Sequence, residues 1–270
     1  MKIAVTRQVG PNIGQGERTH LEREPIDVET AAKEHQEYEE CLADLGCEVH
    51  SLAAEPDLPD SVFVEDCAVV LDELAIVTRP GAKSRRPETS AVADALAQYR
   101  GLARIVGPGT LDGGDVIVIG NDMYVGLSRR TNMAGVKQMD ALVEPLGYNV
   151  TPVPVEACLH LKSAVGRIAP RTLLINRNWV RGEVFREVDL VDIDPEEPQA
   201  AGALLVGETV VYPARFTRTR ARLERAGIKV APLRLSELAK AEAGVTCCSL
   251  VFESKQTQRM NVVLMDSTDD

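Results

Sequence analysis

Residues 68–77 read AVVLDELAIV, two apolar runs on either side of the polar pair Asp72-Glu73. This pattern predicts a β-hairpin, because polar residues mark the turn between two half-buried strands. The same pattern recurs at 116–126, 164–175 and 203–212. A fifth hairpin requires both ends of the chain, with 249–252 paired to 2–5.

A helical run that ends at a glycine and leads into a short strand follows each hairpin. Gly46, Gly101, Gly147 and Gly227 occupy this place, and a degenerate copy puts Gly182 there. Recurrence at a fixed spacing is typical of repeat architectures. The helix that completes the unit formed by the chain ends is expected from about residue 27 to residue 45.

These units predict one α/β domain over residues 1–254, followed by a polar C-terminal extension over 255–270. We expect a five-bladed α/β propeller of pseudo-symmetric ββαβ units, closed by pairing of the N- and C-terminal strands. Closure is favoured because it removes the exposed sheet edge that an open array would leave.

Polar residues stand immediately before the first strand of four of the five units. They are Glu65-Asp66, Asp112 to Asp115, His160 and Cys247, whereas the fourth unit has Ala200-Ala201-Gly202. In a closed ring, equivalent positions face one central axis, so we expect these side chains to meet. Polar residues also start strands for purely structural reasons, but Cys and His are not turn formers.

Composition narrows the functional classes. A net charge of -11 argues against a nucleic-acid-binding surface and favours a cationic small substrate. Met1 leads straight into a predicted strand and no apolar run approaches membrane-spanning length, so we expect a cytoplasmic protein with no membrane partner. Six cysteines without CxxC spacing argue against structural disulfides. The sequence leaves a homodimer open.

The polar cluster suggests nucleophilic catalysis. Cys247 attacks well only as a thiolate, which a neighbouring His160 imidazolium would favour, and either Asp112 or Asp115 could orient that imidazole. Two more carboxylates in the same space call for a cation between them. A guanidinium fits, because its donor fork matches carboxylates. Thiolate attack on its central carbon would give a covalent thiouronium, with His160 protonating the leaving amine and then activating water.

Arginines that follow the second strand of each unit are candidates to bind a substrate carboxylate. These are Arg7, Arg79, Arg129-Arg130, Arg177 and Arg215, with Arg85-Arg86 slightly later. An amino acid with a guanidinium end is therefore the predicted substrate.

Seven motifs together resemble the dimethylarginine dimethylaminohydrolase family of guanidine-modifying enzymes, over about residues 1–252. They are DSVFVED at 60–66, TRPGA at 78–82, SRR at 84–86, LDGGDV at 111–116, GLS with RTN at 126–132, HLKS at 160–163 and TCCS at 246–249. One such motif is weak evidence, but seven in this order are specific.

The resemblance implies a dimethylargininase, which hydrolyses asymmetric dimethylarginine or monomethylarginine to citrulline and an amine, with no cofactor and no required metal. It implies that Cys247 is the nucleophile, that His160 is the acid/base and that Asp112 is the carboxylate that orients His160. It also implies substrate-binding residues: Asp66 with Glu65 for the guanidinium, Arg85 and Arg130 for the α-carboxylate, and backbone near Asp60 and Ala241-Glu242 for the α-amino group. Zinc could bind Cys247 and His160 as an inhibitor.

Two alternatives stay open. The family carries an apolar Leu on a lid loop, whereas the corresponding 15–19 segment here is polar, which would favour arginine deiminase-like hydrolysis of unmethylated arginine. A non-catalytic thiol or metal sensor could use Cys247-Cys248 and His160. The carboxylates at equivalent positions argue against the sensor, because a metal site would not need them.

Overall fold

A computed structural model describes residues 1–254 as a mixed α/β fold with five three-stranded sheets. The predicted extension, 255–270, lies outside the described residues. In every sheet the middle strand pairs antiparallel with one neighbour and parallel with the strand that follows the connecting segment. This is the strand order predicted for a ββαβ unit.

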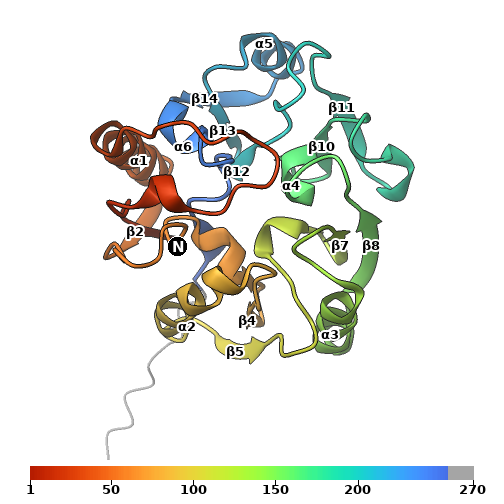
Figure 1. The fold of residues 1–270 in the computed structure, drawn as a ribbon. Helices are drawn as coiled ribbons and strands as arrows, with labels where there is room; N and C mark the ends of the chain where they lie inside the picture. Colours follow the sequence, from red (N-terminus) through yellow and green to blue (C-terminus); the bar gives the residue numbers. More distant parts are fainter. Residues whose placement is uncertain (255–270) are drawn as a thin grey trace, which may run out of the picture.

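The sheets follow one another around the molecule in sequence order, with the longer helices on the outside (Figure 1). Their strands are β15 (Leu250–Glu253), β1 (Lys2–Arg7) and β2 (Cys47–Leu52); β3 (Ala68–Val70), β4 (Leu74–Val77) and β5 (Gly101–Arg104); β6 (Val116–Ile119), β7 (Asp122–Leu127) and β8 (Asn149–Pro154); β9 (Val165–Ala169), β10 (Thr172–Ile175) and β11 (Asp189–Asp192); and β12 (Leu204–Val206), β13 (Thr209–Pro213) and β14 (Lys229–Leu233). The helices are α1 (Val28–Asp44), α2 (Thr89–Leu96), α3 (Met133–Val143), α4 (Leu161–Ala164), α5 (Thr217–Arg225) and α6 (Ser236–Ala239).

The two ends of the described chain share one sheet. Lys2 of β1 lies opposite Glu253 of β15, and Val5 lies opposite Leu250. The sequence predicted this pairing with a shift of one residue. The first strand thus lies between the last strand and β2, so it is not left as an exposed edge.

Helix α1 shows why the predicted boundaries hold. The Asp27 side chain accepts a hydrogen bond from the Thr30 N–H, which caps the first turn. One face of the helix is apolar and buried, including Tyr38 and Leu42. The helix ends before Gly46, whose φ of 87° is a left-handed conformation that glycine adopts easily.

Two of the predicted glycine positions are wrong. Gly101 is the first residue of β5, five residues after α2 ends at Leu96, so it does not terminate that helix. The fourth sheet has only a 3₁₀ turn, η6 (Gly182–Val184), between β10 and β11. Gly182 opens this turn, so it ends no helix.

Apolar side chains from neighbouring sheets pack against each other. Val69 and Ile76 of one sheet join Val116 and Met123 of the next in a single buried cluster. This packing fixes the starts of the first strands, where the candidate site residues lie. Within residues 1–254, no helix is both long and apolar enough to cross a membrane.

Candidate functional site

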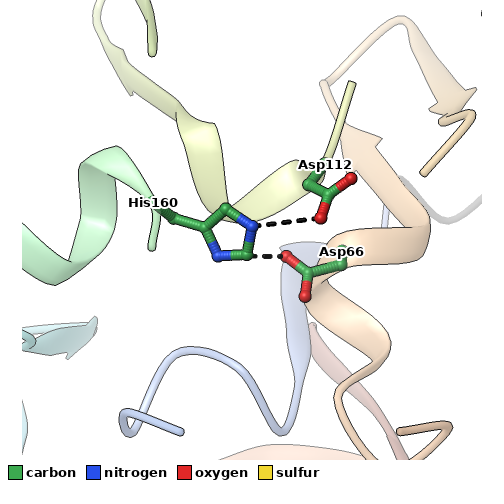
Figure 2. A group of neighbouring side chains, drawn as sticks. All are labelled: Asp66, Asp112 and His160. Carbon is green, nitrogen blue, oxygen red and sulfur yellow. Dashed lines mark hydrogen bonds and ion pairs between the residues drawn. The ribbon is translucent and has the colours of Figure 1, made fainter. Parts of the chain in front are cut away.

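Three segments far apart in sequence bring Asp66, Asp112 and His160 together (Figure 2). Asp66 lies in the 3₁₀ turn η2 (Val64–Cys67), Asp112 directly precedes η4 (Gly113–Asp115), and His160 directly precedes α4. One ligand-type atom from each lies within 4.8 Å of the other two. Each residue stands just ahead of the first strand of its unit, as the repeat predicted.

The His160 imidazole is held by Asp112. Its Nε2 lies 3.0 Å from Asp112 Oδ2, and the other Asp112 oxygen accepts the Gly81 N–H at 2.8 Å. Asp115, the second candidate for this role, instead accepts hydrogen bonds from the Leu161 N–H, Ser128 and Thr131. Asp112 therefore orients the imidazole, while Asp115 braces the start of α4.

The charges around His160 favour its protonated form. Burial lowers the His160 pKa, but Asp66, Asp115 and the bonded Asp112 raise it more, to about 9. The Nδ1 atom lies 3.8 Å from Asp66 Oδ1. Burial raises the pKa of Asp66, yet the positive charges of His160 and Arg85 outweigh it and lower that pKa to about 2. At neutral pH the pair is an imidazolium beside a carboxylate.

Gly114 makes this close arrangement feasible. A Cβ there would lie 2.7 Å from His160 Nδ1 and 2.8 Å from Asp66 Oδ1, which is too close for either contact. Its N–H donates to Asp66 Oδ1 at 3.0 Å. The second glycine of the Asp-Gly-Gly-Asp motif is thus required by the packing of the site.

Cys247 lines the same cavity as His160, but its thiol is not activated. The Gly244 N–H donates to Sγ at 3.3 Å. Burial, followed by the charges of Glu65 and Asp66, raises the pKa of Cys247 to about 12. The expectation that His160 lowers this pKa is therefore not met, because the two nearby carboxylates and burial dominate. A positive charge in the cavity would oppose both the burial and the carboxylates, and would therefore lower the pKa of Cys247.

The neighbouring thiol, Cys248, is in a different environment. It is fully buried in the apolar cluster that contains Tyr38 and Leu42. Both cysteines precede β15, which begins at Leu250, so strand alternation is not what separates them. The turn before the strand places Cys247 at the cavity and Cys248 in the core.

Glu65 joins two walls of the cavity. Its Oε1 accepts from Lys162 Nζ at 2.7 Å and its Oε2 from Thr246 Oγ1 at 2.8 Å. These three residues line both the cavity at Cys247, about 280 Å³, and a larger one of about 500 Å³. Sequence reasoning missed the role of Lys162, although a lysine two residues after the candidate His was a visible signal.

The two arginines predicted to bind the α-carboxylate differ. Arg85 is buried and donates to Asp66 Oδ2 at 2.5 Å, to Glu88, and to the carbonyls of Asp60 and Phe63. These acceptors occupy most of its donors, so the structure favours a role in holding Asp66, and its role as a direct carboxylate ligand stays a prediction. Arg130 donates to Thr19 Oγ1 at 3.2 Å and lies 3.9 Å from Asp112 Oδ2, so it retains donors for a substrate.

A loop formed by residues 16–21, which we call the lid, covers the predicted amino-acid end of the site. Asp60 Oδ2 accepts the Glu17 N–H at 2.8 Å, and Glu242 Oε1 accepts the N–H groups of residues 19–21. Leu21 lines the cavity together with His160 and Cys247. The 15–19 segment is polar, as stated from the sequence, and the apolar residue of the lid lies two positions beyond it.

The remaining predicted residues divide between cavity wall and support. Glu65 and Glu242 line the cavity, whereas Asp60, Asp66, Asp112, Arg130 and Ala241 do not appear on its wall in the described structure. Ala241 is buried and donates its N–H to the Leu238 carbonyl. The cavity wall also includes Trp179, which sequence reasoning did not identify and which no motif signalled.

Comparison with known proteins gives consistent matches. A family model described as eukaryotic N,N-dimethylarginine dimethylhydrolase matches residues 14–183. An N(G),N(G)-dimethylarginine dimethylaminohydrolase of Streptomyces coelicolor is 39% identical over 92% of this chain and 96% of its own length. A Pseudomonas aeruginosa protein with the same description is 36% identical over 84% of this chain and 90% of its own length.

Solved structures agree. A cysteine-to-serine mutant of the Pseudomonas aeruginosa enzyme complexed with citrulline has a TM-score of 0.87 and 33% identity, covering 92% of this chain and 98% of that one. An adduct of a dimethylarginine dimethylaminohydrolase variant with S-methyl-L-thiocitrulline has a TM-score of 0.86 and 33% identity, with the same coverage.

Proposed function

Since this chain belongs to the dimethylarginine dimethylaminohydrolase family, we propose that it hydrolyses Nω-methylated arginines to citrulline and methylamine or dimethylamine. The observation that carries this proposal is the convergence of Cys247, the Asp112-oriented His160 and the acids Glu65 and Asp66 around one site. A thiol, an imidazolium and carboxylates suit attack on a cationic carbon centre.

The first step depends on the substrate charge. In the substrate-free protein the Cys247 thiol is protonated, because burial, Glu65 and Asp66 raise its pKa to about 12. A guanidinium in the cavity neutralises those carboxylates and thereby favours the thiolate. The thiol proton leaves to bulk water, and the thiolate sulfur then attacks the central carbon to form a tetrahedral adduct.

His160 serves in both halves of the reaction. As an imidazolium it donates its proton to the amine nitrogen, the C–N bond breaks, and a covalent thiouronium remains on the sulfur. The neutral imidazole then takes a proton from water as the water oxygen bonds to the same carbon. Loss of the Cys247 thiolate, which takes up the proton of the new hydroxyl group, releases the neutral ureido group of citrulline. The hydrogen bond to Asp112 keeps the ring in place throughout.

The amino-acid end of the substrate belongs under the lid. We assign the α-carboxylate to Arg130 and the α-amino group to Asp60 with backbone at Ala241 and Glu242. Arg85 is instead a positioning residue, since it holds Asp66 Oδ2. Asp66, with Glu65 beside it, remains the proposed guanidinium partner.

Three variants separate the two ends of the site. We expect Asp66→Asn to lower kcat/KM by on the order of 10²-fold on every guanidine substrate, because it removes a charged partner of the guanidinium. Arg130→Ala should be comparably severe for dimethylarginine but mild for agmatine, which has no carboxylate. Arg85→Ala should reduce kcat/KM for both substrates alike, because Arg85 acts through Asp66. Steady-state kinetics on both substrates checks this.

Two outcomes would contradict these assignments. If Arg130→Ala lowered kcat/KM equally for both substrates, the main role of Arg130 would be its contacts with Thr19 and Asp112. If Arg85→Ala affected only dimethylarginine, Arg85 would bind the carboxylate after all. Should the parent not turn over agmatine, competitive inhibition of dimethylarginine hydrolysis by agmatine gives the same comparison.

Citrulline production by chelator-treated protein tests the reaction itself. We expect citrulline from dimethylarginine and monomethylarginine at rates well above that from arginine, because Leu21 lines the cavity and offers apolar contact to methyl groups. Faster hydrolysis of arginine would support the deiminase-like alternative. No citrulline from any substrate, together with tight zinc binding that depends on Cys247 and His160, would support the sensor.

We further propose that residues 1–254 form one closed five-bladed propeller. The pairing of β1 with β15 supports closure. All six cysteines are unpaired, which favours a reducing, cytoplasmic setting. The reaction as written requires no cofactor, and a homodimer stays a prediction.

A further inference from the structure

Glu242 connects the lid to the catalytic cavity. Its Oε1 accepts three successive backbone N–H groups of the lid, from Thr19 at 2.9 Å and from His20 and Leu21 at 2.6 Å each. Glu242 also lines the cavity that contains Cys247. Hydrogen bonds to an ionised carboxylate are stronger than those between neutral groups, so this contact is a main attachment of the lid.

The backbone of Glu242 has an unusual conformation. Its φ of 61° is left-handed, which among the described residues only Glu187 shares outside glycine. Such a conformation is unfavourable for a side chain that has no role, and it occurs often at functional sites. The left-handed turn directs the carboxylate toward residues 19–21, more than 200 positions away in sequence.

The second oxygen of this carboxylate has no partner. Glu242 Oε2 is buried and accepts no hydrogen bond from any residue between 1 and 254. A buried acceptor without a donor is costly, so this oxygen is available to a donor from outside the protein. Arg18, whose side chain is only 6% exposed, lies close enough for its pKa, lowered by burial, to be raised by the charges of Asp60 and Glu242, but it makes no hydrogen bond to Oε2. It donates to the carbonyls of Glu17 and Ile13 and lies 3.9 Å from Asp60 Oδ1.

We propose that Glu242 is the latch of the lid and a direct acceptor for the ammonium group of the substrate. Oε1 holds residues 19–21 over the cavity, and Oε2 accepts an N–H of the α-ammonium. Substrate binding then fixes the Glu242 side chain in the position that holds the lid closed. This coupling makes the enzyme selective for α-amino acids over simple guanidines. The ammonium part rests on the proposed function, whereas the latch part does not.

Two substitutions separate the two oxygens. Glu242→Gln keeps a carbonyl oxygen for the three lid N–H groups but puts an NH₂ donor where the ammonium would bind. Glu242→Gly removes both oxygens and suits the φ of 61°. Glu22→Gln is the matched control, because it removes one negative charge from an exposed residue next to the lid.

Limited trypsin digestion of the substrate-free protein measures the latch without any catalysis. Cleavage after Arg18 and Arg23, followed by mass spectrometry, reports how often the lid opens. We expect Glu242→Gly to be cut about tenfold faster or more, with an unchanged Tm, and Glu22→Gln to be cut at nearly the parent rate. Glu242→Gln should fall between the parent and Glu242→Gly, because its neutral carbonyl still accepts the lid N–H groups but more weakly than a carboxylate does. Parent-like cleavage of Glu242→Gly would overturn the latch.

Calorimetric binding of two ligands measures the ammonium contact. Citrulline has the ammonium, while 5-ureidopentanoate has the same ureido and carboxylate groups without it. We expect Glu242→Gln to weaken the affinity for citrulline by roughly 10- to 100-fold and to leave the affinity for 5-ureidopentanoate unchanged. Equal citrulline affinity in Glu242→Gln and parent would overturn the ammonium assignment. Failure of the proposed function would appear differently, as absence of citrulline formation by the parent while the trypsin pattern persists.

Discussion

Replacing Cys247 with Ser is expected to abolish citrulline formation, with a loss of turnover on the order of 10⁴-fold or more. A hydroxyl is a poor nucleophile unless a base removes its proton, and His160 is held as an imidazolium by Asp66, Asp115 and Asp112. The variant should still bind methylated arginine, because the carboxylates and Arg130 are unchanged. Steady-state kinetics combined with calorimetric binding checks both expectations.

Two other thiols provide the controls for this prediction. Cys158 also lines the cavity, but its Sγ donates to the His160 carbonyl at 3.3 Å, and Cys248 is buried in the core. Cys158→Ser and Cys248→Ser should keep most of the turnover per folded molecule. Cys248→Ser should lower the free energy of unfolding by about 1–3 kcal/mol, because it buries a hydroxyl among apolar side chains. Loss of activity in all three variants would refute the assignment of Cys247.

The hairpins and the outer helix α1 were predictable because their signals are local. Apolar runs, polar turns and the Asp27 cap are all visible within a few residues, and the observed boundaries agree to within one or two positions. The helix expected in the fourth unit is absent, because the connection between β10 and β11 contains only the short 3₁₀ turn η6. Gly182 leaves room for Arg177 and Leu190, a contact that no local pattern reveals.

The membership of the site was predictable from the repeat, but its internal contacts were not. Position in the unit identified Asp66, Asp112 and His160 as neighbours. Whether an arginine is free for a substrate depends on which acceptors surround it in three dimensions, and Arg85 is surrounded by them. The raised pKa of Cys247 likewise depends on burial and on distances between charges, which sequence spacing does not contain.

The Glu242 latch illustrates the same limit. The family resemblance singled out the backbone at Ala241-Glu242, but nothing in the 236–244 segment marks the Glu242 carboxylate as a lid contact, and Glu237 in the same segment pairs instead with Lys240. Only the fold brings its carboxylate to the N–H groups of residues 19–21. Contacts between a loop and a distant turn are set by the packing of the sheets, so local sequence patterns do not predict them.

Changing His160 to Asn is expected to stop steady-state turnover, with a loss of roughly 10²- to 10⁴-fold, because it removes the proton donor for the amine and the base for water. Asn preserves some of the volume and can still donate a hydrogen bond to Asp112. Thiol attack and hydrolysis are separable by single-turnover kinetics. Activity within tenfold of the parent would mean that another residue is the acid/base.

The same variant should change how stability depends on pH. The His160 pKa is raised from its ordinary value of 6.5 to about 9 in the folded protein, so the imidazolium stabilises the fold fully below pH 6.5. That contribution, on the order of 3 kcal/mol, is lost as pH rises through 9. Urea unfolding of the parent at pH 6 and pH 9.5 should show this loss, and His160→Asn should not show it.

At the acid side the variant should be more sensitive than the parent. His160 is the strongest of the charges that lower the pKa of Asp66 to about 2, and that lowered pKa stabilises the fold above pH 3.8 and fails as pH falls through 2. Without the imidazolium, Asp66 protonates at higher pH, so the stability of His160→Asn should begin to fall earlier on acidification. Superimposable pH–stability curves for the two proteins would show that the charges of His160 and Asp66 are not coupled, and the electrostatic account of the site would then fail together with the imidazolium proposed as the proton donor.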